Sequence, residues 1–170
     1  AMIPLAYVLG AVPSGYLIGK LSKGIDIREH GSGKTGMSNV LRVVGKKAAF
    51  VVLVSDCLKG ALAVILVQML TDSSVFLVAV ATAVLVGHNY SIFIRFHGGA
   101  GVLTGVGTLF AFIPVAGVMA ALVGGLAILL FWYMSLGSLS GTLAALATAA
   151  YLWAAHDHEG TGTVYILIGA

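Results

Sequence analysis

The sequence predicts an all-α polytopic membrane protein, a bundle of about seven transmembrane helices, and three observations support this fold class. The chain of 170 residues is 59% hydrophobic and only 9% charged, with a mean hydropathy of +1.06. Long apolar runs recur along the chain, and most Lys and Arg residues gather in one stretch. Because a soluble domain carries about a quarter charged residues, lipid is the expected solvent for this much apolar surface.

Three apolar runs in the first half of the chain are long enough to cross a membrane. A helix rises about 1.5 Å per residue, so about 20 apolar residues span the hydrocarbon core. The three predicted spans cover residues 2–21, 48–70 and 75–94. Polar or glycine-rich segments separate them, at residues 22–47, 71–74 and 95–99.

The second half of the chain predicts three shorter or tilted helices. Residues 102–155 contain no Lys, Arg, Asp, Glu or His. Pro114 with Gly117 indicates one boundary in this stretch, and residues 135–140 indicate another. A polar segment at 156–161 then precedes a new apolar run, which we interpret as the start of a seventh helix. We therefore expect one transmembrane domain over residues 1–170, with its C-terminus truncated.

The placement of charge predicts how the chain is oriented in the membrane. Seven cations flank or lie in the first long loop: Lys20, Lys23, Arg28, Lys34, Arg42, Lys46 and Lys47. If the spans alternate, Arg95 falls on the same side, whereas Asp72, Asp157 and Glu159 fall opposite. By the positive-inside rule, the 22–47 and 95–101 loops are cytoplasmic and the N-terminus is outside.

Most of the 23 glycines are interpreted as packing devices, since small residues let membrane helices approach closely. The first loop, however, places glycines beside donors of hydrogen bonds, in the segment 30–42. Gly33-Lys34-Thr35 resembles part of a P-loop, but Arg28 stands where the complete pattern needs a glycine. We therefore exclude a nucleotidase. A glycine loop with lysine, arginine and amide donors is still suited to a phosphate; the alternative is a basic loop that only sets topology.

Few other side chains are candidates for binding or catalysis. Asp56 and Lys59 lie three residues apart inside the second predicted span, so they share a helix face and are expected to pair and face the interior. His88 and Asn89 lie near the cytoplasmic end of the third span, before a second glycine-rich loop at 98–101. No Cys/His cluster has metal-ligand spacing, so we expect no metal and no cofactor.

Taken in order, these pieces resemble the bacterial acyl-phosphate:glycerol-3-phosphate acyltransferases of the PlsY type. The resemblance covers nearly the whole chain. It rests on the following residues: Pro13, Ser14, Gly15, Tyr16, Gly31, Ser32, Gly33, Gly36, Asn39, Arg42, Gly45, Lys46, Lys47, Asp56, Lys59, Gly60, Gly87, His88, Asn89, Phe93, Phe96, Gly98, Gly99, Gly101, Val102 and Thr104.

The resemblance implies a seven-helix enzyme of the bacterial inner membrane, acting in phospholipid biosynthesis. It would transfer a fatty acyl group from acyl phosphate to glycerol 3-phosphate, giving lysophosphatidic acid. Its partners would be these two substrates and membrane lipids, and no nucleic acid. His88 is the candidate base, with substrate phosphate as the other proton acceptor, and Asp56 and Lys59 are structural. The candidate substrate-binding residues are Ser32, Gly33, Lys34, Asn39, Arg42, Lys46, Asn89, Gly98, Gly99 and Gly101.

The sequence departs from the family pattern in places that support alternatives. Ala100 stands where the second glycine loop usually carries lysine, and Lys34 stands where the first usually carries asparagine. Ser38 stands where threonine is usual, and a third motif is expected beyond residue 170. The alternatives are a catalytically impaired membrane homologue that binds lipid or anions, and a small-solute transporter. If the enzyme interpretation holds, Lys34 is the candidate to supply the charge that Ala100 lacks.

Overall fold

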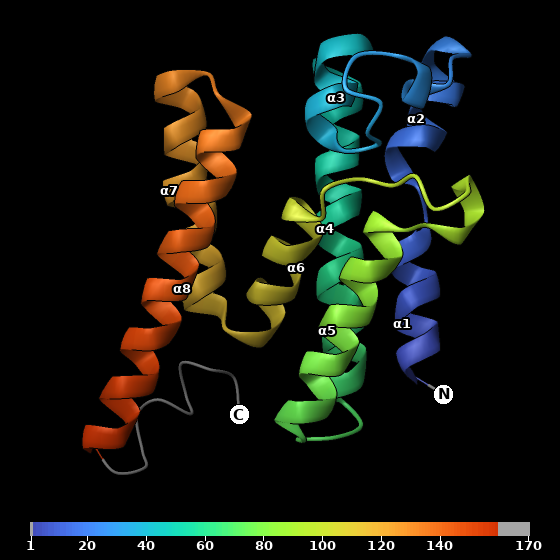
Figure 1. Cartoon of the computed structure of the whole chain (residues 1–170). Coiled ribbons are helices and arrows are strands. Elements are labelled where there is room, and N and C mark those ends of the chain that lie inside the picture. The colour runs from blue at the N-terminus through green and yellow to red at the C-terminus, as the bar shows by residue number, and fades with distance from the viewer. Residues whose placement is uncertain (1, 160–170) are drawn as a thin grey trace. The chain divides into compact units, whose positions relative to one another are not determined.

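The computed structural model describes residues 2–159, and every regular element in that range is helical (Figure 1). The α-helices are α1 (Met2–Ala11), α2 (Ser14–Lys23), α3 (Met37–Val43), α4 (Lys46–Gln68), α5 (Ser74–Asn89), α6 (Val102–Phe112), α7 (Pro114–Phe131) and α8 (Met134–Glu159). Two 3₁₀ turns, η1 (Ile27–Glu29) and η2 (Ile92–Ile94), lie in the loops. The all-helical prediction is confirmed.

Within the described residues, five segments are long and apolar enough to cross a membrane. They are Met2–Lys23, Lys46–Gln68, Ser74–Ile94, Pro114–Phe131 and Met134–Ala155, and α6 is a shorter apolar helix. The three helices expected after residue 101 are confirmed as α6, α7 and α8. The start of the predicted seventh span lies outside the described residues. The chain divides after Thr108 into two compact units, and the candidate site lies in the first.

The first predicted span, 2–21, is confirmed as Met2–Lys23, but its helix is broken into α1 and α2. The break falls at Val12 and Pro13, because proline has no amide hydrogen to continue the ladder. Two main-chain carbonyls at the break accept hydrogen bonds from side chains far away in the sequence. Ser91 Oγ donates to the Ala11 carbonyl, and Lys59 Nζ donates to the Val12 carbonyl at 3.2 Å. The break therefore brings polar side chains of α4 and of the segment after α5 to the first span.

The third predicted span, 75–94, is confirmed as Ser74–Ile94. Within it the α-helix ends at Asn89, and the chain turns through η2 before residue 95. The last described span, Met134–Ala155, ends where the polar segment predicted at 156–161 begins, although α8 itself continues to Glu159. A helix needs only satisfied backbone hydrogen bonds to continue, so polar side chains past a span do not by themselves terminate it.

Glycines permit close helix contacts in the first unit, as the sequence predicted. A Cβ at Gly10 or Gly87 would collide with a backbone carbonyl of the facing helix, which is α5 or α1 respectively. Gly60 of α4 and Gly107 of α6 meet in the same way, against backbone atoms of each other's helix. Because apolar side chains gain little by leaving lipid, this backbone contact is a main source of helix association.

The second unit is the pair α7 and α8, which pack directly on each other (Figure 1). Gly124 of α7 lies against Gly137 and Gly141 of α8, where a Cβ on any of them would meet the facing backbone. Large apolar side chains remain on the outside, including Leu129 and Trp132, which are 72% and 86% exposed. In water such a surface would be unstable, so it is consistent with a helix pair immersed in lipid.

Candidate functional site

The first glycine loop joins α2 to α3 and is organised by one buried amide side chain. Asn39 is 2% exposed, and its Nδ2 lies 3.1, 3.0 and 2.9 Å from the carbonyl oxygens of Ile27, His30 and Lys34. Its Oδ1 accepts from the Ser32 amide at 2.9 Å. The Asn39 amide therefore shapes the loop, and its role in binding substrate stays a prediction.

Two glycines in this loop have backbone angles that other residues avoid. Gly31 and Gly33 have φ of 61° and 71°, in the left-handed region where a Cβ is unfavourable. A Cβ on Gly31 would also collide with Asn39 Oδ1. Beneath the loop, Ile27 and Val40 are fully buried and pack with Ala49 and Val52 of α4. The loop therefore has a defined backbone conformation and packs on buried apolar side chains.

The second glycine loop folds back onto the end of α5. The Gly98 amide donates to the Asn89 carbonyl at 3.1 Å, and the Gly99 amide donates to the His88 carbonyl at 3.2 Å. A Cβ on Gly98 or Gly99 would collide with His88, and Gly101 has a φ of 77°. These positions require glycine, because main chain lies directly on main chain and on the imidazole.

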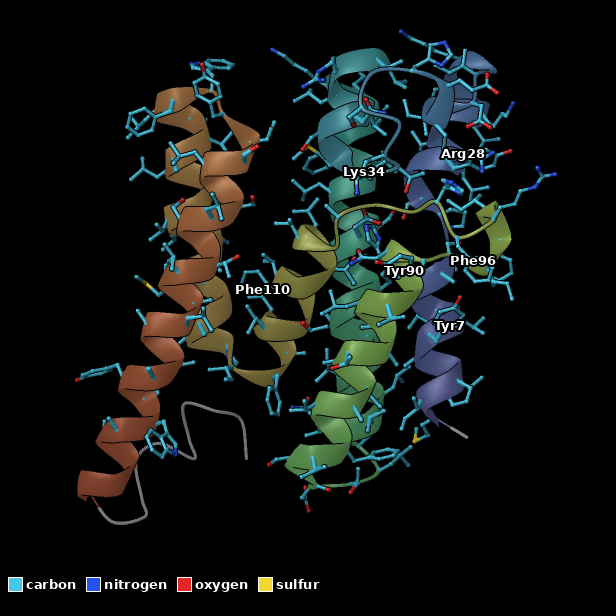
Figure 2. All side chains as sticks on the ribbon, in the orientation of Figure 1. Tyr7, Arg28, Lys34, Tyr90, Phe96 and Phe110 are labelled. Carbon is cyan, nitrogen blue, oxygen red and sulfur yellow. The ribbon has the colours of Figure 1, made fainter. Side chains whose placement is uncertain are left out.

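The two glycine loops meet, although about 60 residues of chain separate them. The Thr35 amide donates to the Gly98 carbonyl at 3.4 Å. In Figure 1 the segment after η2 runs beneath the first loop on its way to α6, and in Figure 2 the labelled Lys34 lies where the two approach. The structure thus brings together the two sets of residues that the sequence singled out separately.

Several polar side chains of the first loop and of the helices that follow it are exposed. Ser32, Lys34, Arg42 and Lys46 are all exposed. None of these three cations has an ion-pair partner in the part of the chain that the structure describes. Exposed cations beside backbone amides are the ordinary donors for a phosphate or another anion. The neighbouring Ala100 is exposed and brings no charge.

Sequence reasoning missed Arg28 and Asp26 as paired residues. Arg28 Nη2 lies 2.6 Å from Asp26 Oδ2, and Nε donates to Oδ1 at 3.0 Å. The hydrogen bond from Arg28 lowers the pKa of the Asp26 carboxyl to about 2, and the same bond raises the pKa of Arg28. The spacing of one residue between opposite charges was the available signal, but it says nothing of geometry.

The predicted ion pair inside the second span is confirmed. Lys59 Nζ lies 2.8 Å from Asp56 Oδ1, and the two side chains are 6% and 2% exposed. Ser14 Oγ of α2 donates to the same oxygen at 2.6 Å, and His88 Nδ1 of α5 lies 3.7 Å from it. Buried charges persist only when paired and hydrogen-bonded, so this cluster ties α2, α4 and α5 together. Ser14 was noted in the sequence only as part of the resemblance, and its bond to Asp56 was not predicted.

His88 and Asn89 lie under the second glycine loop. The His88 side chain is 6% exposed and sits between Asp56 and Gly99, whose Cβ would collide with His88 Nε2. Asn89 Oδ1 is buried without a hydrogen-bond partner among the described residues and faces Gly101. Residues 2–159 hold no group of three or more His, Cys, Asp or Glu side chains that would suit a metal.

An apolar groove follows the first span beside α4. It has a volume of about 290 Å³. Its walls are Leu9, Val12, Leu17, Ile18 and Leu21, with Ser14, Ser55 and Lys59 on one side. A mostly apolar groove with few polar groups suits a hydrocarbon chain better than a polar solute.

The fold and the site define a helical integral membrane protein with two glycine-rich loops joined at one end of its first unit. A family model described as glycerol-3-phosphate acyltransferase matches residues 1–170, and the chain belongs to this family of membrane acyltransferases. A relative named glycerol-3-phosphate acyltransferase from Myxococcus xanthus is 40% identical over 161 residues, covering 94% of this chain and 84% of its own. One of the same name from Thermus thermophilus is 42% identical over 153 residues, covering 88% and 76%.

Two solved structures have the same fold. One is PlsY, described as an integral membrane glycerol 3-phosphate acyltransferase, in its glycerol 3-phosphate form. It is 37% identical with a TM-score of 0.81, over 91% of this chain and 76% of that chain. The lysophosphatidic acid form of PlsY is 36% identical with a TM-score of 0.77, over 91% and 75%. The transporter alternative is therefore set aside.

Proposed function

We propose that the chain transfers a fatty acyl group from acyl phosphate to glycerol 3-phosphate, giving lysophosphatidic acid and inorganic phosphate. The observation that carries this proposal is the junction of the two glycine loops at Thr35 and Gly98, with the exposed Lys34 next to it in sequence. The forms in which PlsY was solved support it, since one is described with glycerol 3-phosphate and the other with lysophosphatidic acid.

Phosphate is held by both loops in this proposal. Ser32, Lys34 and Arg42 contribute the hydroxyl and the cations, and Lys46 contributes more weakly. Gly33, Gly98, Gly99 and Gly101 contribute by letting the loops pack closely at the junction, because protein atoms occupy the space that a Cβ on each would fill. Asn39 acts by shaping the first loop, because its amide is hydrogen-bonded to the main chain there. Asn89 is a candidate donor or acceptor for substrate, because its buried Oδ1 has no partner among the described residues.

The reaction needs orientation and charge neutralisation more than a covalent nucleophile. The glycerol hydroxyl oxygen attacks the acyl carbonyl carbon, and the bond from that carbon to the phosphate oxygen breaks. Phosphate is a good leaving group, so positioning and fixed positive charge lower the barrier. The hydroxyl proton goes to a phosphate oxygen of the substrate, because His88, the other candidate, is buried beneath Gly99.

The acyl chain is placed in the apolar groove along α1 and α2 in this proposal. The groove is apolar like the lipid around it, so the acyl group stays in an apolar environment when it binds. Leu17 lines this groove, and a larger side chain there would reduce the space for the acyl chain.

We further propose that the loops face the cytoplasm of the bacterial inner membrane, with the N-terminus outside and residues 1–170 forming one domain. The one-sided distribution of Lys and Arg supports this orientation. Impermeant thiol labelling of Lys23→Cys in a Cys57→Ser background tests it. The proposal requires protection in intact cells and labelling after lysis, and labelling of intact cells would reverse the topology.

The decisive experiment is a direct assay of purified protein in lipid with acyl phosphate and labelled glycerol 3-phosphate. We expect labelled lysophosphatidic acid and stoichiometric phosphate, with no product from acyl-CoA. If the protein binds glycerol 3-phosphate without any transfer, the impaired-homologue alternative favoured by Ala100 replaces this proposal.

A further inference from the structure

Arg28 contacts three different parts of the first unit, although it lies outside both glycine loops. Its Nε and Nη2 donate to the Asp26 carboxylate, and its Nη1 donates to the Ile94 carbonyl at 3.0 Å. The guanidinium carbon lies 5.0 Å from the centre of the Tyr16 ring, within the range of a cation–π contact. The side chain is 27% exposed, so these contacts are partly shielded from water.

The contact with Ile94 joins the two loop regions. Arg28 lies in the segment that leads into the first glycine loop, whereas Ile94 ends η2, which leads into the second. The direct contact between the loops, from the Thr35 amide to the Gly98 carbonyl, is 3.4 Å long. A hydrogen bond of that length is weak, so it does not by itself hold the loops at a defined separation.

We propose that Arg28 is a positioning residue that sets the separation of the two glycine loops, so that one phosphate fits both. The inference rests on the proposed function, because it assumes that the loops share a ligand. Binding of a phosphate from two sides requires donors placed within about 0.5 Å of their productive positions. A side chain that bonds both loop regions supplies this precision without touching the substrate.

The charge on Arg28 is neutralised by a neighbouring carboxylate, which distinguishes Arg28 from a residue that binds phosphate. Asp26 neutralises the guanidinium through two hydrogen bonds. Its carboxyl has a pKa of about 2, so the pair stays ionised throughout the neutral range. Lysine does not replace arginine here, because a single ammonium has no planar fork for a carboxylate and a carbonyl at once. The free cations Lys34 and Arg42 remain available for substrate.

The kinetic test compares Arg28→Lys and Asp26→Asn with Lys47→Gln, which removes an exposed and unassigned cation from the N-terminal turn of α4. We expect Arg28→Lys and Asp26→Asn each to raise KM for glycerol 3-phosphate about tenfold. The value of kcat should change less than about threefold, since the lost contact stabilised substrate and transition state equally. Lys47→Gln should leave both constants unchanged. Thermal unfolding of each variant identifies loss of folded protein, which lowers the apparent kcat and leaves KM unchanged.

A second measurement does not depend on turnover. Spin labels at Ser38→Cys and Ala100→Cys, in a Cys57→Ser background, report the distance between the two loop regions. We expect one narrow distance distribution with Arg28 present and a broader one in Arg28→Lys. An unchanged distribution overturns the proposal, whatever happens to KM, and so does a broader distribution with an unchanged KM. If the native protein transfers no acyl group, the proposed function fails. The positioning role of Arg28 is judged separately, and it is overturned if Arg28→Lys leaves the distance distribution narrow.

Discussion

Lys34 is the residue at which the proposed phosphate site is most directly testable, because the sequence contains no Lys or Arg after Arg95. Ala100 brings no charge to the second glycine loop at 98–101. Asn39 fixes the Lys34 carbonyl at 2.9 Å, and the next residue, Thr35, bonds Gly98 of the second loop. Lys34 is thus an exposed cation next in sequence to the residue that contacts this loop.

The expected effect of Lys34→Ala follows from the loss of one charge-assisted hydrogen bond. Such bonds contribute about 1.5–3 kcal/mol, and exposure of Lys34 favours the lower value. We therefore expect kcat/KM for glycerol 3-phosphate to fall about tenfold. Ala100→Lys alone should raise it less than about threefold, because Lys34 already neutralises the phosphate. In the double variant the new lysine should recover most of the loss.

The assay is formation of lysophosphatidic acid at varied glycerol 3-phosphate, with saturating acyl phosphate. Lys34→Arg is the matched control, since it keeps the charge and should stay within about threefold of the native enzyme. The reasoning is refuted if Lys34→Ala leaves kcat/KM unchanged, or if Ala100→Lys fails to recover activity in the Lys34→Ala background. Either result would mean that the two positions do not face the same phosphate.

Four further predictions concern the rest of the site. Arg42→Ala should lower kcat/KM at least about tenfold by removing a charge-assisted contact, measured in the same transfer assay; unchanged activity would exclude Arg42 from the phosphate site. Asp56→Asn should destabilise the protein by about 3–5 kcal/mol. The double change with Lys59→Gln should cost less in the same unfolding experiment, because it leaves no unpaired buried charge. Leu17→Trp should shift preference to shorter acyl phosphates, and equal activity across chain lengths would place the acyl chain elsewhere. The carboxyl of Asp26 has a folded pKa of about 2, below its ordinary value of 3.8. Its contribution to the free energy of unfolding is therefore complete above pH 3.8 and is lost as pH falls through 2. Acid unfolding of Asp26→Asn should lack this loss of stability.

Much of the fold could be predicted from short segments of this sequence. Each predicted span depends on the length of an apolar run, and membrane thickness converts length directly into a helix. The ion pair of Asp56 and Lys59 was also predictable, since three residues along a helix place two side chains on one face. Boundaries were less predictable. Pro13 interrupts the first span, and α8 continues into the polar segment as far as Glu159, because backbone hydrogen bonding rather than side-chain polarity decides where a helix ends.

The sequence by itself determined that this protein lies in the membrane, which of its segments span it, and which glycine loops and cations are candidates for phosphate. It did so because hydropathy, charge distribution and motif spacing are properties of short segments. Only the tertiary structure decided that Thr35 meets Gly98, that Arg28 bonds Ile94, and that Ser14 joins Asp56. These contacts join residues between 42 and 66 positions apart, and their formation depends on how whole helices pack, which no local pattern in the sequence specifies.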